Sequence, residues 1–226
     1  MNEAGPSTRA LGDALCLTAP TVSLDTAVRL VFEQYGVVGC ARRLTGERDQ
    51  NFLIQTGQDR DYLLKVSHPA EDRAATDFQT QALLHISRSD PDLPVPQVIP
   101  SVNGRVALLL TLDDGEPRIV RLLTYLHGDL LSKAPRSLAQ RHHLAATLAR
   151  LALALQGFEH PAAEHELLWD LKHAARLKSL LVHLPDAGRR ALAEHALAEY
   201  AEHVEPRLSG LRCQVVHNDL NDHNVL

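Results

Sequence analysis

Residues 215–226 read VVHNDLNDHNVL, a polar cluster framed by apolar residues at both ends. The cluster gathers His217, Asp219, Asp222 and three asparagines within eight positions. A polar turn between two strands is one interpretation, because Asp and Asn are favoured in turns. On either interpretation of the cluster, RCQVV (212–216) is expected to form the entering strand and NVL (224–226) to begin the next one.

The spacing inside the cluster favours a catalytic loop over a purely structural turn. His217, Asp219 and Asn224 follow H-x-D-x-x-x-x-N, the spacing of a kinase catalytic loop. There the aspartate accepts a proton from the attacking hydroxyl, and the asparagine amide oxygen reaches a magnesium ion on the phosphates. Four intervening residues let the loop fold back so that both side chains enter one cleft, while His217 holds the loop backbone in shape.

A lysine inside an apolar strand is the second observation. Lys65 lies in YLLKV (62–66), and strands expected near 40–45, 51–56 and 61–66 make it part of the third. A strand lysine usually extends its charged end to solvent. A kinase, however, uses a lysine on the third strand of a small sheet to hold the α- and β-phosphates. The preceding turn contains Gly46, and the backbone N–H groups of this turn could bind phosphates.

The order of elements along the chain agrees with such an enzyme. Helical periodicity over 23–36 begins at the cap Ser23, ends at Gly36 and puts Val28, Val31 and Phe32 on one face. Further helices are predicted over 71–88, 137–157 and 187–204, and a second hairpin over 105–126. A strand-rich first half with one inserted helix is therefore followed by a helical second half.

Composition excludes several classes of protein. The chain has 226 residues, a net charge of −5 and 4% aromatic residues, which argues against nucleic-acid partners and anionic membrane surfaces. Three distant cysteines do not suggest a disulfide framework, and no signal peptide or membrane-spanning run is evident, so a reducing, cytoplasmic setting is expected. Cys213, His217 and His223 suggest a zinc site, but they lack a fourth ligand, and the loop role of His217 is favoured.

Four segments together resemble the aminoglycoside phosphotransferase and choline kinase superfamily, which has a protein-kinase-like fold. They are GERDQNFLI, YLLKV, RLLTYLHG and VVHNDLNDHNVL, and they look most similar to the hydroxylysine-kinase-like branch, which includes phosphotransferases fused to class III aminotransferases. The resemblance implies an α+β fold with a small antiparallel-sheet N-lobe and a helical, partial C-lobe. It implies an N-terminal arm over 1–22, a nucleotide-binding N-lobe over 23–126 and a C-lobe over 127–226 that ends in the catalytic loop.

The resemblance also implies an activity and its catalytic residues. The activity is ATP- and Mg²⁺-dependent phosphorylation of a hydroxyl on a small amine-bearing molecule, such as hydroxylysine, an aminoglycoside, choline, ethanolamine or homoserine. Asp219 would be the catalytic base, Asn224 a magnesium ligand and Lys65 the phosphate-binding lysine.

Further residues are implied to bind the nucleotide. The turn from Gly46 through Asp49 to Asn51 would be the nucleotide loop. The backbone of Thr124, Tyr125 and Leu126 would form the hinge that meets adenine.

The sequence departs from the family pattern in two places. Kinases pair the strand lysine with a glutamate on the following helix, whereas the best-aligned position here is Gln79, with Asp77 a substitute only if the helix is rotated. The second metal-binding aspartate, usually in a D-F-G-like triplet after the catalytic loop, does not appear before Leu226. We therefore expect the N-terminal part of a kinase, either as a fragment or as a domain of a longer chain. The alternative is a non-catalytic, pseudokinase-like nucleotide-binding or regulatory module.

Overall fold

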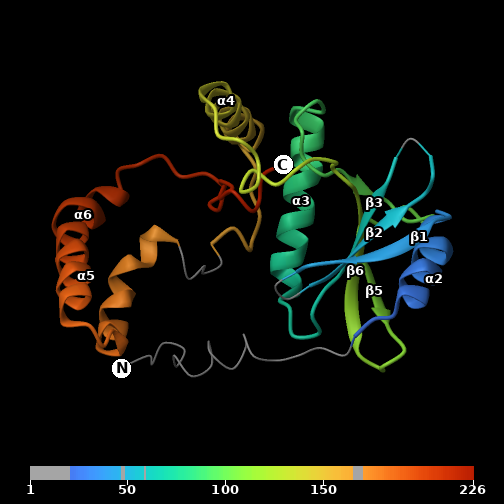
Figure 1. Ribbon diagram of the computed structural model, residues 1–226, viewed down its shortest axis with the longest axis horizontal. Helices are drawn as coiled ribbons and strands as arrows, with labels where there is room; N and C mark the ends of the chain where they lie inside the picture. The colour runs from blue at the N-terminus through green and yellow to red at the C-terminus, as the bar shows by residue number, and fades with distance from the viewer. Residues whose placement is uncertain (1–20, 47–48, 59, 165–169) are drawn as a thin grey trace.

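The computed structural model describes residues 21–46, 49–58, 60–164 and 170–226. Most of the arm expected over 1–22 and positions 47–48 of the expected nucleotide loop lie outside these residues. A β-sheet occupies one end of the molecule, and the helices of the second half lie toward the other end (Figure 1).

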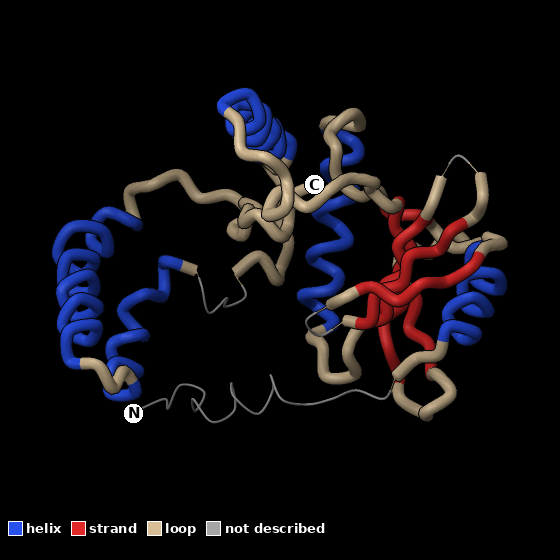
Figure 2. The backbone as a smooth tube through the Cα atoms, in the orientation of Figure 1, coloured by secondary structure: helices blue, strands red, loops and turns tan. Residues whose placement is uncertain are grey.

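One antiparallel sheet of six strands dominates the first half (Figure 2). Its order is β1-β2-β3-β6-β4, with β5 also paired to β6. The strands are β1 (Cys40–Leu44), β2 (Gln50–Gln55), β3 (Tyr62–Val66), β4 (Val98–Ile99), β5 (Leu108–Thr111) and β6 (Pro117–Thr124). Both expected hairpins are present, since β2 pairs with β3 and β5 with β6, and Lys65 lies on the third strand.

Helix α2 (Leu24–Tyr35) covers one face of the sheet (Figure 1). The Ser23 side chain accepts from the Thr26 amide at its start, and Gly36 ends it at φ 67°, a left-handed conformation that glycine adopts without strain. Val31 is buried, but Phe32 is 59% exposed, so the predicted apolar face was wrong at that position. The buried stripe turns away from Phe32 because α2 contacts the sheet through Ala27, Leu30, Val31 and Tyr35.

Helix α3 (Arg73–Ser89) lies on the other side of the sheet and joins the two halves of the chain (Figure 1). Ile86 near its end packs with Leu93 and with residues from α4 (Leu138–Ala154). Val215, at the entrance to VVHNDLNDHNVL, packs against the same cluster. This second apolar cluster therefore connects the sheet-bearing half to the segment that carries the H-x-D motif.

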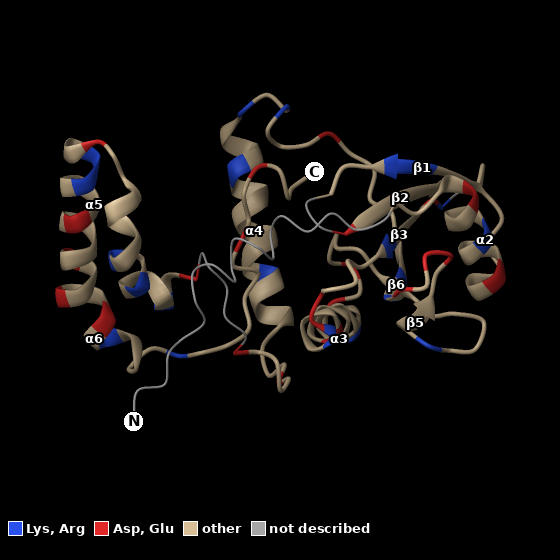
Figure 3. Cartoon of the chain, turned by 90° about the horizontal axis from the view of Figure 1, so that it is seen from below, with Lys and Arg blue, Asp and Glu red and all other residues tan. Residues whose placement is uncertain are grey.

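The second half is helical, as expected, with different boundaries. A 3₁₀ segment, η1 (Leu171–His183), is followed by α5 (Ala187–Glu199), a π-helical turn (Tyr200–Val204) and α6 (Glu205–Leu208). Lys and Arg are interspersed with Asp and Glu on these helices and around the sheet (Figure 3). In the part of the chain that the structure describes, no helix is both long and apolar enough to cross a bilayer.

The strands expected at 212–216 and 224–226 are absent, and both segments are irregular. An extended segment becomes a strand only when a neighbouring backbone offers N–H and C=O groups in register. None of the described strands pairs with either segment. Instead, the Gln214 side chain donates to the Ala152 carbonyl at 2.9 Å, which ties the first segment to the end of α4.

Candidate active site

Asp219 lies at the centre of a small network of side-chain amides. Asn221 Nδ2 donates to Asp219 Oδ1 at 2.7 Å, and Asn224 Nδ2 donates to Asp219 Oδ2 at 2.8 Å and to its carbonyl at 2.9 Å. The Asp219 amide donates to His217 Nδ1 at 3.3 Å. Between them Asn218 takes a left-handed φ of 60°, which Asn tolerates better than most residues. The H-x-D-x-x-x-x-N spacing thus brings its three residues into one folded loop.

The loop is attached to the segment that follows β6. The Leu131 amide donates to the Val225 carbonyl at 2.8 Å, and the Ser132 amide donates to the Asp222 carbonyl at 2.9 Å. A Cβ added to Gly128 would lie 2.9 Å from the Leu226 Cβ, so the chain passes very close at this point. Residues 90 or more positions apart in the sequence are therefore adjacent, and the motif sits just beyond the expected hinge.

A pocket of about 440 Å³ adjoins Asp219. Its walls are the loop and one face of α4, and they consist of Leu148, Leu151, Ala152, Val216, His217, Asn218, Asp219 and Leu220. The pocket is apolar, and Asp219 is one of the residues that line it.

Lys65 forms an ion pair with Asp49 from the expected nucleotide loop. The Nζ–Oδ2 distance is 3.3 Å, and the two side chains are 26% and 20% exposed. Asn51 stands opposite Lys65 in the β2–β3 register. The sequence predicts that Lys65 and Asp49 belong to the same site, and in the structure the two side chains are in contact.

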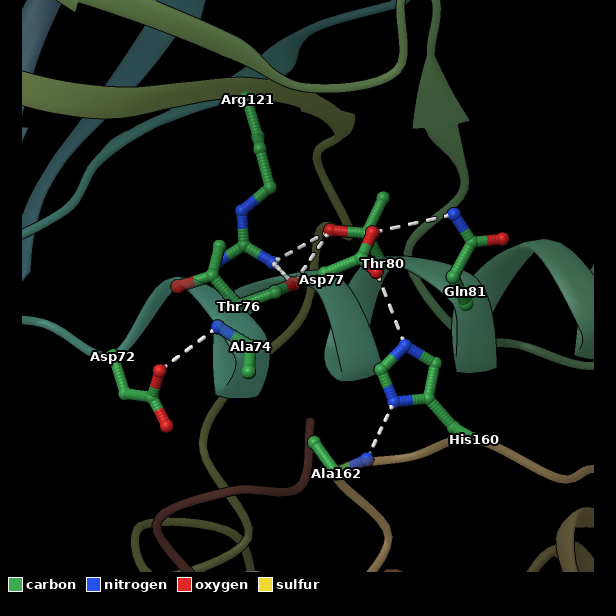
Figure 4. A network of polar contacts seen from close by, with 9 residues as sticks. All are labelled: Asp72, Ala74, Thr76, Asp77, Thr80, Gln81, Arg121, His160 and Ala162. Carbon is green, nitrogen blue, oxygen red and sulfur yellow. Dashed lines mark hydrogen bonds and ion pairs between the residues drawn. The ribbon is translucent and has the colours of Figure 1, made fainter.

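Gln79, the position that aligns best with the kinase glutamate, makes no hydrogen bond to Lys65 among the described residues. Gln79 Oε1 accepts from Arg121 Nη2 at 3.3 Å. Arg121 on β6 also donates through Nη1 to the Thr76 carbonyl at 3.3 Å and to Thr80 Oγ1 at 3.2 Å (Figure 4). Arg121 stands directly opposite Lys65 in the β3–β6 register. Its long side chain reaches these acceptors on α3.

Asp77 is not the substitute partner either. Its Oδ2 lies 3.1 Å from His160 Nε2, on the segment after α4 (Figure 4). His160 Nδ1 accepts from the Ala162 amide at 3.1 Å, which leaves Nε2 to donate to Asp77. The contact links α3 to the second half of the chain, away from Lys65.

The expected nucleotide loop begins at a position that requires glycine. A Cβ on Gly46 would lie 2.5 Å from the Asp49 carbonyl oxygen and 2.6 Å from Asn51 Nδ2. Gly46 therefore lies very close to Asp49 and to the start of β2. Asn51 Oδ1 is buried and has no hydrogen-bond partner among the described residues, so the site contains an acceptor that a bound donor or cation would satisfy.

Two of the three hinge amides are already engaged. The Thr124 amide donates to the Gln97 carbonyl at 2.9 Å, and the Tyr125 amide donates to the Asp61 carbonyl at 3.0 Å. Within the described chain no acceptor is found for the Leu126 amide. A base bound at the hinge would therefore find its donor at Leu126.

The oxygen atoms near Asp219 fit a magnesium ion that is held mainly by phosphates and water. Because Asn224 Nδ2 is bound to Asp219, the Asn224 amide oxygen remains for a cation. Mg²⁺ prefers oxygen ligands and often takes only one or two from the protein. No group of three His, Cys, Asp or Glu side chains arranged for a metal occurs among the described residues.

The geometry can be compared with known proteins. A model of the phosphotransferase enzyme family matches residues 41–226, from β1 through the Asp219 loop. The chain belongs to this phosphotransferase family.

Other phosphotransferases and kinases are similar to this one. A hydroxylysine kinase of Xenopus laevis is 27% identical over 229 residues, covering 94% of this chain and 61% of the relative. The structure of spectinomycin phosphotransferase in complex with ADP and spectinomycin matches with a TM-score of 0.58 at 12% identity, covering 92% of this chain and 66% of that one. Amicoumacin kinase in complex with AMP-PNP and Ca²⁺ matches with a TM-score of 0.53 at 10% identity, covering 78% and 55%.

These likenesses confirm the kinase-like α+β fold. The chain spans about three fifths of the length of the hydroxylysine kinase it matches.

Arg121 is a residue of the candidate site that the sequence pattern did not single out. It lies in RIVRLLT, an otherwise largely apolar strand, as Lys65 does in YLLKV. A basic residue inside a buried strand was the available signal, because such a residue is rarely buried without a partner.

Proposed function

We propose that this phosphotransferase transfers a phosphoryl group from ATP, with Mg²⁺, to a hydroxyl of a small amine-bearing molecule. The observation that carries the proposal is the folded loop in which Asn221 and Asn224 hold both oxygens of the Asp219 carboxylate. A carboxylate held in place beside a pocket can orient a hydroxyl and accept its proton. Family membership supports the same reaction class.

Three residues of the chain have a role in the proposed reaction. Asp219 accepts the proton of the acceptor hydroxyl, and its amide partners keep the carboxylate oriented. Lys65 neutralises charge on the phosphates after exchanging its bond with Asp49. Asn224 offers its amide oxygen to the metal. The bound nucleotide supplies the phosphoryl group, and its magnesium ion offsets the charge that develops on the phosphates.

Hydroxylysine-like amino alcohols are the first substrate class of the proposal. The relative from Xenopus laevis carries the name hydroxylysine kinase, and the match covers most of this chain. Aminoglycosides, choline or ethanolamine, and homoserine follow. The net charge of −5 is compatible with a cationic acceptor.

A non-catalytic nucleotide-binding module is the second candidate. The observation that favours it is the bond between Gln79 and Arg121, because Lys65 then has no anionic partner on α3. A kinase relies on that lysine–glutamate pair when it becomes active.

The first experiment measures thermal unfolding of the 226-residue chain with ATP, in the presence and absence of Mg²⁺. We expect ATP to raise the melting temperature, the gain to be lost in Lys65→Ala, and the gain to persist in Lys178→Ala, an exposed lysine on η1. A wild-type chain whose melting temperature does not change when ATP is added would contradict the proposal.

A second measurement separates the two candidates. The chain is incubated with ATP, Mg²⁺ and a panel of amino alcohols, and phosphorylated product is sought by mass spectrometry. Product from any acceptor supports the transferase, whereas ATP-dependent stabilisation without product supports the binding module.

A further inference from the structure

Arg121 is a buried cation whose direct partners are neutral. The residue is 3% exposed, and its guanidinium donates to the Thr76 carbonyl, the Thr80 hydroxyl and the Gln79 amide oxygen. No ion pair to Arg121 is found among the residues that the structure describes. A buried charge without a directly bound counter-ion is costly, so its retention calls for a physical reason.

A second cation stands beside it. Lys65 on β3 is the cross-strand partner of Arg121 on β6, so both side chains leave the sheet on the same face. Like charges directly opposite one another destabilise a strand pair. Asp49 offsets part of this repulsion through its contact with Lys65 and through its charge near Arg121. Lys65, Arg121 and Asp49 are here called the Lys65 cluster; it contains two cations and one carboxylate, and the charge of Glu71 also acts on Arg121.

Helix α3 adds no negative charge to the Lys65 cluster. In kinases a glutamate on the corresponding helix neutralises the strand lysine. Here the helix presents Gln79, which accepts a hydrogen bond from Arg121 but carries no charge. Burial lowers the pKa of Arg121, while the charges of Asp49 and Glu71 act in the opposite sense. The arginine therefore holds α3 to the sheet through neutral acceptors, and none of these direct partners neutralises its positive charge.

We propose that Arg121 is a positioning residue whose buried charge reinforces Lys65 in attracting and orienting the nucleotide polyphosphate, and that the neutral Gln79 preserves this charge. The inference rests on the proposed function and deepens it. Arg121 does not touch the phosphates, because its two amino groups are bonded to α3. Its effect would reach the ligand through Lys65 and through the electric field of its own charge.

The test compares ATP with adenosine, because adenosine lacks the polyphosphate. Dissociation constants of both ligands are measured by calorimetry on the 226-residue chain. In Arg121→Gln, which removes the charge and keeps a donor near Thr76 and Thr80, ATP affinity should fall about tenfold and adenosine affinity by less than about twofold. Equal losses for both ligands would show a merely structural role and overturn the inference.

A second variant works in the opposite direction. Gln79→Glu places an anion against Arg121, so the melting temperature should rise while ATP affinity falls about fivefold and adenosine affinity is unchanged. ATP affinity that stays equal or increases would overturn the inference, even if Arg121→Gln fails to fold. Arg105→Gln, at an exposed arginine in a loop, is the matched control and should leave both affinities unchanged.

The outcomes separate this inference from the proposed function. A wild-type chain that binds no ATP overturns both. A wild-type chain that binds ATP, with variants in which ATP and adenosine respond alike, overturns the inference alone.

Discussion

Lys65 and Asp49 are joined by an ion pair of 3.3 Å, between β3 and the turn before β2. The Asp49 carboxylate is bound to the ammonium group of Lys65, which the proposed reaction assigns to the phosphates. Both side chains are about three-quarters buried, so the contact is less screened than a surface pair. In the proposed reaction an incoming phosphate has to replace this carboxylate, so the pair would be a determinant of nucleotide affinity.

Replacing Asp49 with asparagine should therefore strengthen ATP binding. Asp49→Asn removes the competing anion from Lys65 and increases the positive field of the Lys65 cluster, so the dissociation constant for ATP should fall about fivefold. Calorimetry at low and moderate salt measures the effect, which should shrink as salt increases. Asp25→Asn, at an exposed position on α2, removes the same charge elsewhere. Weaker ATP binding in Asp49→Asn would refute a competing role.

Gly46→Ala should damage the nucleotide loop. The added methyl group would lie within 2.6 Å of the Asp49 carbonyl oxygen and of Asn51 Nδ2, so backbone has to move. We expect ATP affinity to fall by about tenfold, because the turn at the start of β2 would be displaced. Gly210→Ala is the control, since its Cβ would meet nothing nearer than 3.6 Å. Retained ATP affinity in Gly46→Ala would remove this turn from the nucleotide site.

Asp219→Asn should abolish turnover and spare nucleotide binding. The substitution removes the proton acceptor, so turnover should fall about 10³-fold, while ATP affinity stays within about threefold because Lys65 and the Gly46 turn are untouched. Rates are measured in a form of the protein that shows turnover, with ATP affinity measured in parallel. Asp222→Asn is the matched control, because Asp222 pairs with Arg136 at 3.6 Å in the same loop. Normal turnover in Asp219→Asn would exclude this residue as the base.

The link between α3 and α4 should depend on pH. Arg150 donates to both oxygens of Asp90, at 3.0 and 2.7 Å, and these hydrogen bonds lower the pKa of the Asp90 carboxyl. A lowered folded pKa means that the stabilisation is present above the ordinary value of 3.8 and is lost as pH falls through the folded value.

Thermal unfolding of Arg150→Ala tests this dependence. The wild type should melt above the variant at pH 7, and the difference should disappear at strongly acidic pH. Arg141→Ala, at an exposed position on the same helix, should show no such pH-dependent difference. A difference between wild type and Arg150→Ala that stays constant across the pH range would mean that Asp90 is not the responsible group.

Sequence patterns with a local cause were the most predictable part of this fold. The periodicity of YLLKV and RIVRLLT, the Ser23 cap and the Gly36 stop depend on neighbouring residues, and the corresponding elements are present. The H-x-D-x-x-x-x-N spacing is equally local, since Asn224 reaches back to Asp219 within one turn of the loop. The sequence alone therefore predicted most of the strands and helices and the folded loop around Asp219.

Contacts between distant segments were decided by the tertiary structure. The β3–β6 register put Arg121 opposite Lys65, and this neighbour, invisible in either strand alone, took Gln79 as its partner. The segment at 212–216 has the composition of a strand, but it finds no strand to pair with among those described and stays irregular. Residue types set what each group can bind, whereas only the packing of sheet and helix selects which partner it meets.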